Sequence, residues 1–218
     1  KAKRARCVNA VAPGRLPLER KLDACQRLYE EVGLPMLLRI TPFSEPPGLE
    51  RWLEQRGMRR IDDTRVMVAT RLEASAAAAP AGVTLSQVGH EAFAQIVGAM
   101  RGSSLAQRQA HGQRLVNSPV PFSAWVLKHD GEALACGQFA LEHDVVGLYD
   151  VFTAAPARGR GLARLLCTHL LAEAARRGAG CAYLQVESDN HPARAVYHGL
   201  GFSDAYAYHY RTPHAGAV

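Results

Sequence analysis

The pattern of apolar and polar positions predicts alternating strands and helices along most of the chain. Short β-prone runs indicate strands, and apolar residues that recur at helical spacing indicate helices. After residue 80 we expect strands at 83–88, 123–129, 132–141, 145–153, 181–187 and 205–211. We expect helices there at 90–101, 105–116, 162–177 and 193–200. Strands that crowd together early and later alternate with helices favour an α/β fold with a mixed sheet and helices on both faces.

A glycine-rich turn separates the predicted strand 145–153 from the predicted helix that follows it. It reads Arg158-Gly159-Arg160-Gly161-Leu162-Ala163. Backbone N–H groups converge at the start of a helix, where the helix dipole is positive, so this position favours phosphate. The two glycines let the backbone approach a ligand closely, and the arginines supply charge. The alternative is a tight turn with surface arginines.

A second set of polar residues follows the strand predicted at 181–187. Asn190 precedes a short predicted helix, which carries Tyr197 and stops at Gly201-Phe202. Tyr197 shares a helical face with apolar neighbours, so a buried core position is the alternative to a chemical role. Asn190 is equally compatible with a plain helix N-cap.

The two segments together resemble the GCN5-related N-acetyltransferase (GNAT) family. Arg158, Gly161 and Ala163 match that family's acetyl-CoA loop, Arg/Gln-x-x-Gly-x-Gly/Ala. Its later segment, Asn-x-x-Ala-x-x-x-Tyr-x-x-x-Gly-Phe, is matched by Asn190, Ala193, Tyr197, Gly201 and Phe202. The resemblance covers roughly residues 82–212. It implies the acyl-CoA N-acyltransferase fold and direct transfer of an acetyl group from acetyl-CoA to a primary amine of a small molecule or peptide.

The resemblance also implies roles for single residues. The strand before the loop is expected to bond the pantetheine arm of coenzyme A and to polarise the thioester carbonyl, while the loop holds the pyrophosphate. The residues expected to bind acetyl-CoA are Val151, Phe152, Thr153, Arg158, Gly159, Arg160, Gly161, Leu162, Ala163, Asn190 and Tyr197.

The reaction needs a proton donor and a proton acceptor. A phenol with an ordinary pKa near ~10 can protonate a departing thiolate, so Tyr197 is expected to be the general acid. The candidates for the general base are Asp150 and Glu187, each of which is also compatible with a surface or salt-bridging role. The family often carries a glutamate on the preceding strand, whereas this chain has Tyr149-Asp150 there.

The front of the chain repeats part of this pattern. A low-complexity stretch predicts a domain boundary near residue 80, between an N-terminal region (1–80) and an acetyltransferase domain (81–218). Helices at 18–31 and 48–55 and strands at 36–41 and 65–70 suggest a degenerate half-copy of the same fold, with a structural or substrate-framing role. In this alignment Leu16 takes the place of Gly161, and Leu53 that of Tyr197. The alternative is coincidence between two ordinary α/β units.

Composition narrows the other possibilities. The net charge of +6 arises mostly in residues 1–80, and we expect no nucleic-acid or membrane partner. Five cysteines without paired spacing suggest free thiols in a cytoplasmic protein, and nine scattered histidines predict no metal site. A non-catalytic acyl-CoA-binding regulatory module stays open, as does a nucleotide-binding domain with a fully parallel sheet. The identity of the amine acceptor and the choice between monomer and homodimer are also left open.

Overall fold

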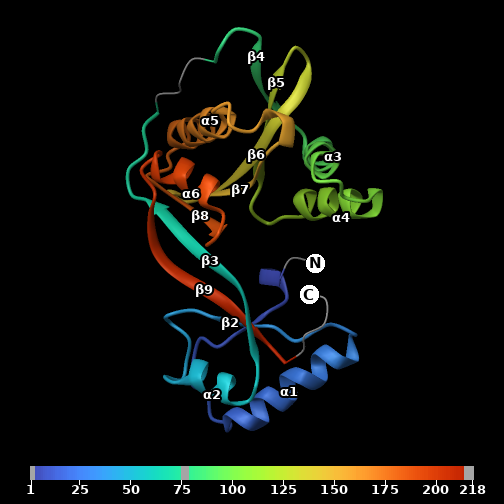
Figure 1. Ribbon diagram of the computed structural model, residues 1–218, viewed down its shortest axis with the longest axis vertical. Helices are drawn as coiled ribbons and strands as arrows, with labels where there is room; N and C mark the ends of the chain where they lie inside the picture. Colours follow the sequence, from blue (N-terminus) through green and yellow to red (C-terminus); the bar gives the residue numbers. More distant parts are fainter. Residues whose placement is uncertain (1–2, 75–78, 214–218) are drawn as a thin grey trace. The chain divides into compact units, whose positions relative to one another are not determined.

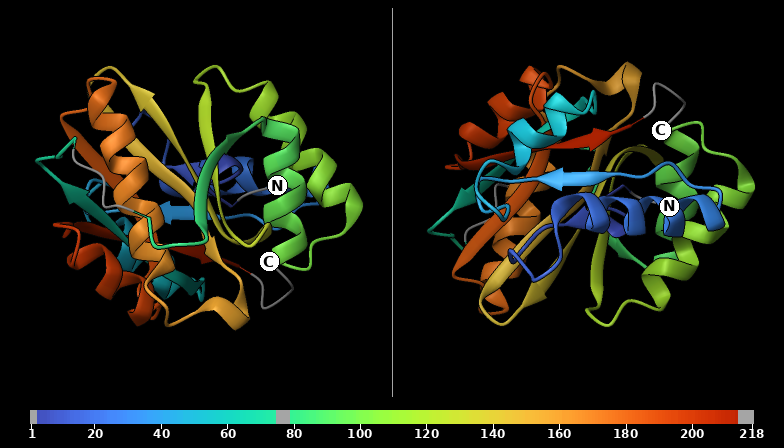
Figure 2. Two further views of the ribbon diagram at one scale, coloured as in Figure 1. Left: turned by 90° about the horizontal axis from the view of Figure 1, so that it is seen from above. Right: turned by 90° about the horizontal axis from the view of Figure 1, so that it is seen from below.

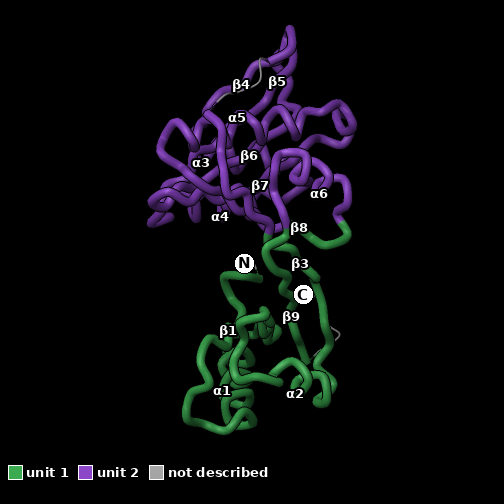
Figure 3. Tube along the Cα trace, turned by 90° about the vertical axis from the view of Figure 1, so that its left-hand side faces the viewer, with its two compact units in different colours: residues 1–66, 186–189, 204–218 green, residues 67–185, 190–203 purple. Residues whose placement is uncertain are grey.

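The structure is a computed structural model that describes residues 3–74 and 79–213 (Figure 1). The described chain forms two compact units that are not continuous in sequence (Figure 3). Unit 1 holds the residues up to Val66 together with Val186–Asp189 and those from Asp204 onward, and unit 2 holds Met67–Gln185 and Asn190–Ser203. These units follow compactness in space, whereas the boundary near residue 80 rests on a low-complexity stretch of the sequence. That boundary stays a prediction.

Unit 2 contains a mixed sheet. Its strands follow the order β8-β7-β6-β5-β4. The pairs β4–β5, β5–β6 and β6–β7 are antiparallel, and the pair β7–β8 is parallel. The antiparallel pairs rule out the fully parallel sheet of a nucleotide-binding domain. The strand bounds are Val83–Val88 (β4), Phe122–His129 (β5), Glu132–Glu142 (β6), Val145–Thr153 (β7) and Cys181–Glu187 (β8), of which the last two residues belong to unit 1.

Helices cover both faces of this sheet because successive side chains of a strand point to opposite faces. Cys136 packs in a core with Phe93 and Leu115, which belong to α3 and α4. At the neighbouring Gly137, an added Cβ would meet Leu166 and Leu170 of α5. Figure 2 shows α5 and the α3–α4 pair on the two sides of the strands. The helices of unit 2 are His90–Met100 (α3), Leu105–Val116 (α4), Leu162–Arg176 (α5) and His191–His198 (α6).

Unit 1 joins the front of the chain to its last strand. β1 is parallel to β2, β2 is antiparallel to β9, and β3 lies next to β9. The side chains of Met36, Leu38, Ile40, Leu49, Leu53 and Met58 form a core here. The elements are Lys3–Ala5 (η1, a 3-10 helix), Val8–Asn9 (β1), Leu18–Glu31 (α1), Leu38–Ile40 (β2), Leu49–Gln55 (α2), Arg59–Ala69 (β3) and Ser203–Thr212 (β9).

The backbone supports a duplicated pattern. The order β1-α1-β2-α2-β3 repeats β7-α5-β8-α6-β9, and the first two strands of each set are parallel. All four helices are followed by a glycine with positive φ: Gly33 (+63°), Gly57 (+72°), Gly178 (+98°) and Gly201 (+86°). The next N–H then reaches back five residues, in the pairs Leu34→Tyr29, Met58→Leu53, Ala179→Ala174 and Phe202→Tyr197.

These matched helix ends place Leu53 in the position of Tyr197, as the sequence alignment predicts. The same alignment places Leu16 at Gly161. The N-cap of α1 is the next residue, Pro17, with φ of −54°, whereas Gly161 is itself the N-cap of α5, with φ of +74°. The half-copy therefore lacks both the left-handed glycine and the phenol.

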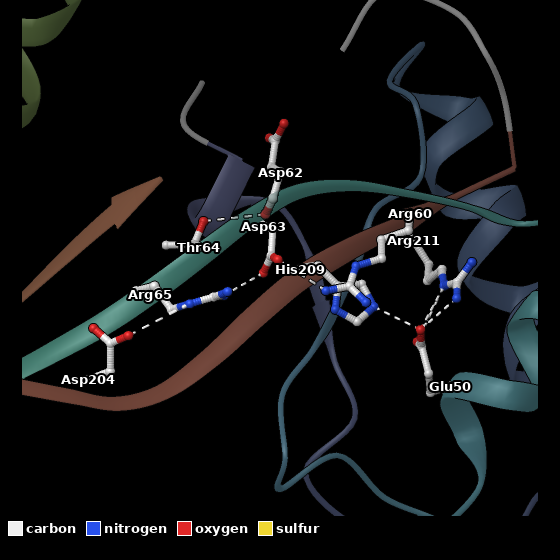
Figure 4. Close-up of polar contacts among 9 residues, drawn as sticks. All are labelled: Glu50, Arg60, Asp62, Asp63, Thr64, Arg65, Asp204, His209 and Arg211. Carbon is white, nitrogen blue, oxygen red and sulfur yellow. Dashed lines mark hydrogen bonds and ion pairs between the residues drawn. The ribbon is translucent and has the colours of Figure 1, made fainter. Parts of the chain in front are cut away.

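The end of β9 is tied to α2 by a buried cation (Figure 4). The Arg211 side chain, only 7% exposed, donates to the Glu50 carboxylate at 2.6 Å and to the Met58 carbonyl at 2.6 Å. His209 contacts the same carboxylate at 3.0 Å. Burial opposes ionisation of Glu50, but hydrogen bonds from Arg211 and then His209 outweigh it and lower the pKa of the carboxyl.

We expect Glu50→Gln to destabilise the protein by about 1–2 kcal/mol at neutral pH. The change removes the anion from a buried guanidinium, and the partial exposure of Glu50 limits the effect. Because the folded pKa is lowered, the stabilisation is full above the ordinary pKa of about 4.3 and is lost as pH falls through the folded value. Urea unfolding at several pH values measures this. Glu54→Gln, on a side chain 68% exposed and 3.6 Å from Arg211, is the control; an equal loss in both variants would contradict the account.

Candidate functional site

The glycine-rich turn forms an open start to α5. A 3-10 turn, Ala155–Ala157 (η2), leads from β7 into the turn, and Gly161 is the N-cap of the 15-residue helix. Gly159 and Gly161 have φ of +75° and +74°, and a Cβ built on either meets no protein atom within 4 Å. The first N–H groups of a helix have no intrahelical partner, so those of α5 point into this open space. The geometry provides a cradle for an anionic group.

The two arginines of the turn are exposed on its surface. The Arg158 guanidinium lies 5.8 Å from the centre of the Phe152 ring, and its Nε is 3.4 Å from the Thr153 carbonyl oxygen. The backbone N–H of Arg158 donates to Ala155 at 3.3 Å, so it is already engaged within the turn. The N–H groups that start α5 are therefore the better anion donors, with the arginine side chains as added charge.

β7 separates from β8 before either strand ends. The two strands pair where Val145–Gly147 lies beside Cys181–Tyr183, whereas β7 continues to Thr153. On its other side β7 stays paired, with Phe152 opposite Cys136 and Thr153 opposite Ala135. Within the described residues, the edge of β7 that faced β8 thus has backbone groups at 151–153 that no strand pairs. An extended ligand can bond such an edge as an added strand would.

Tyr197 is a buried residue of α6. Its side chain is 9% exposed and its ring lies 6.1 Å from that of Phe202. Burial, with a smaller effect of the nearby Cys167 in α5, raises the pKa of the phenol. The phenol therefore stays protonated through neutral pH, as a general acid must, and Tyr197 also fills the core position that its helical face predicts.

Asn190 serves as the N-cap of α6. Its side-chain oxygen accepts a hydrogen bond from the Ala193 N–H at 3.2 Å. Asn190 therefore caps the helix, as one of the two interpretations of the sequence predicts. A contact of the Asn190 amide with the cofactor arm stays a prediction.

Asp150 lies in a distorted part of β7. It is one of four non-glycine residues with positive φ among the described residues, at +50°, and the β6–β7 register shifts between Cys136 and Gln138, next to it. Three donors hold its carboxylate: Arg101 at 2.8 Å, Gln138 at 2.8 Å and His111 at 3.2 Å. Burial opposes its ionisation, but the hydrogen bond from His111 and the charge of Arg101 lower the pKa of Asp150 to about 2.

The sequence predicted Asp150 but not its three partners. Arg101, His111 and Gln138 lie far from Asp150 along the chain, and no motif links them. The other predicted base, Glu187, is exposed at the end of β8 and belongs to unit 1, whereas Asp150, Tyr197, Asn190 and the glycine-rich turn belong to unit 2.

Comparison with known proteins identifies the family. A model described as the Acetyltransferase (GNAT) family matches residues 93–202, half of the chain. The chain belongs to this family. The resemblance seen in the sequence is thereby confirmed, and acetyl-CoA is the co-substrate that goes with the GNAT family.

Two solved GNAT structures share the fold at low identity. A GCN5-related N-acetyltransferase from Kribbella flavida has a TM-score of 0.67 at 19% identity, over 89% of this chain and 74% of the other. A protein described as a tandem GNAT protein from the clavulanic acid biosynthesis pathway has a TM-score of 0.74 at 20% identity, over 94% of this chain and 73% of the other. The mixed α/β GNAT fold is confirmed, and the tandem architecture supports the half-copy.

A curated relative is more similar over a shorter stretch. A mycothiol acetyltransferase from Nocardioides sp. is 43% identical over 81 residues, which are 37% of this chain and 27% of that protein. The chain thus spans about a quarter of the length of that relative.

The described residues are compatible with the acetyl-CoA site that the sequence predicts. The open glycines at the start of α5 match a pyrophosphate, and the unpaired edge of β7 matches the amide-bearing pantetheine arm. Within residues 3–74 and 79–213, no group of three or more His, Cys, Asp or Glu side chains is placed to hold a metal ion. Over the same residues, no helix has both the length and the apolar character that a membrane crossing requires.

Proposed function

We propose that this chain transfers an acetyl group from acetyl-CoA to a primary amine. The observation that carries the proposal is the succession of an unpaired β7 edge, an open glycine turn and the free start of α5 in one continuous segment. This segment offers hydrogen-bonding groups to both the arm and the pyrophosphate of coenzyme A. Family membership gives the reaction class.

Each part of the chain has a role in this proposal. The start of α5 binds the pyrophosphate, and the backbone at Val151–Thr153 orients the pantetheine arm and polarises the thioester carbonyl. The amine nitrogen attacks the carbonyl carbon, the C–N bond forms, and the C–S bond breaks. Tyr197 donates its proton to the departing thiolate, whose ordinary pKa is about 8.5.

The acceptor is proposed from the curated relative. Because the similarity to a mycothiol acetyltransferase reaches 43% over 81 residues, we propose an amine related to mycothiol as the acceptor to test first. Other small amines and peptide N-termini form the comparison set.

An acceptor panel tests the proposal. The protein is incubated with acetyl-CoA and each amine, and the product is detected by its gain of one acetyl group in mass spectrometry, since a thiol reagent would also react with a mycothiol-like acceptor. We expect turnover with at least one amine. Binding of acetyl-CoA in calorimetry without any acetylated product would contradict the enzyme and favour the regulatory acyl-CoA-binding module.

A further inference from the structure

The carboxylate of Asp150 contacts the imidazole of His111, to which the proposed acetyl transfer gives no role. His111 projects from α4, and its Nε2 lies 3.2 Å from Asp150 Oδ2. The His111 side chain is 18% exposed, so it is enclosed without being sealed. Its ring lies edge-on to Phe93, with ring centroids 6.5 Å apart, and this contact fixes the plane of the imidazole.

Asp150 itself is a poor proton acceptor. Its carboxylate already accepts from Arg101, Gln138 and His111, and these contacts favour the ionised form. A carboxylate with a pKa of about 2 has little tendency to take a proton from an amine whose ordinary pKa is near ~10.4. The backbone of Asp150 lies in the left-handed region, with φ of +50°.

The same contacts favour His111 as the proton acceptor. With Asp150 accepting a hydrogen bond from Nε2–H, the neutral ring carries its lone pair on Nδ1. Asp150 also stabilises the imidazolium that forms when Nδ1 takes a proton. Asp150 directly precedes, in β7, the Val151–Thr153 backbone, which is the proposed site of the thioester.

We propose that His111, oriented by Asp150, is the general base that takes the proton of the acceptor amine. This inference rests on the proposed acetyl transfer. The amine proton moves to His111 Nδ1, directly or through one water, as the C–N bond forms, and Tyr197 returns a proton to the thiolate as the C–S bond breaks. His111 then acts as the catalytic base and Asp150 as a positioning residue.

Other charged groups surround the pair and bear on its pH dependence. Arg101 follows α3 and shares the Asp150 carboxylate, and Cys136 on β6 is a thiol whose pKa is raised by burial to about 12. α3 packs against α4 and carries His90 and Glu91, while Arg108 and Arg114 lie on α4 itself. Of the groups named here, Asp150 is the one whose contact with the His111 ring is an ion-pair distance, 3.2 Å.

The test is the pH profile of kcat/KM for the full chain, with the amine that the wild-type protein acetylates. We expect an acid limb in the wild type, because protonation of a general base removes its activity. His111→Gln should remove this limb and lower kcat/KM by about 10²–10⁴. Acetyl-CoA affinity in calorimetry should change less than about threefold, because His111 is not among the groups that bind the cofactor.

The control is a second His–Asp pair on the surface of the same unit. His129 lies 3.5 Å from Asp130 in the β5–β6 turn, and His129→Gln should leave both the pH profile and the rate unchanged. If His111→Gln does not fold, Asp150→Asn gives the same test: the acid limb should move to lower pH, because the imidazolium loses its carboxylate partner.

The possible results separate the two proposals. If the wild type turns over an amine and His111→Gln keeps its acid limb with a rate within threefold, the cluster is only a structural ion pair and the inference is overturned. If the wild type acetylates no amine, both the proposed function and the inference are overturned.

Discussion

Gly161→Leu is expected to abolish acetyl-CoA binding while the protein stays folded. Gly161 has φ of +74° and open space beside it, so a leucine side chain there would occupy the anion cradle rather than clash with the protein. The left-handed backbone costs a non-glycine residue about 1–2 kcal/mol, which a folded domain can tolerate. Calorimetry with acetyl-CoA measures the loss, and circular dichroism with thermal unfolding measures the fold.

Gly178→Leu is the matched control for this change. Gly178 lies at the other end of α5, also has positive φ (+98°), and also has no protein atom within 4 Å of an added Cβ. The Gly178→Leu variant should lose a similar free energy of unfolding and keep its acetyl-CoA affinity. Normal binding by Gly161→Leu would remove the glycine turn from the site.

Tyr197→Phe is expected to lower kcat by about 10²–10⁴ with little change in acetyl-CoA affinity. Phenylalanine keeps the buried ring and its contact with Phe202, so only the proton donor is lost. Because burial raises the pKa of the phenol, wild-type kcat should not fall between neutral pH and pH ~10 through loss of this proton.

Tyr210→Phe tests whether the loss of a buried hydroxyl alone explains the effect. Tyr210 is 3% exposed on β9, and the proposed reaction gives it no role. It should keep the wild-type rate. A Tyr197→Phe variant with wild-type kcat would take Tyr197 out of the mechanism.

The sequence predicted the local elements well where periodicity was strong. The bounds of α1, α4, β4, β7 and β8 agree with the predicted ranges. β3 begins at Arg59 rather than at residue 65, because its first half is charged and shows no apolar alternation. β1 was not predicted, since two residues carry no periodic signal and the strand is defined by its pairing with β2.

The site was predictable in part. The glycine turn and Tyr197 lie in local motifs. The structure gives the turn the open helix start that it favours, and it buries Tyr197 as the apolar helical face predicts. The partners of Asp150 come from α4, β6 and the end of α3, and only the sheet and helix packing brings them together. The sequence therefore indicated Asp150 as a candidate base but not its contact with His111.

The half-copy explains why we propose one cofactor site. The place of Gly161 is taken by Leu16, which precedes the α1 N-cap Pro17 with its φ of −54°, and the place of Tyr197 by the fully buried Leu53. This copy has neither the open turn nor a proton to donate. Its helix ends, which match those of the second copy, and its apolar core are consistent with the structural role that the sequence suggests.

A crystal structure of the chain with coenzyme A tests the central proposal most directly. We predict the pyrophosphate at the N–H groups that begin α5, the pantetheine arm along Val151–Thr153, and the sulfur within hydrogen-bonding reach of the Tyr197 hydroxyl. Coenzyme A bound elsewhere, or a Tyr197 hydroxyl closed off from the sulfur, would contradict it.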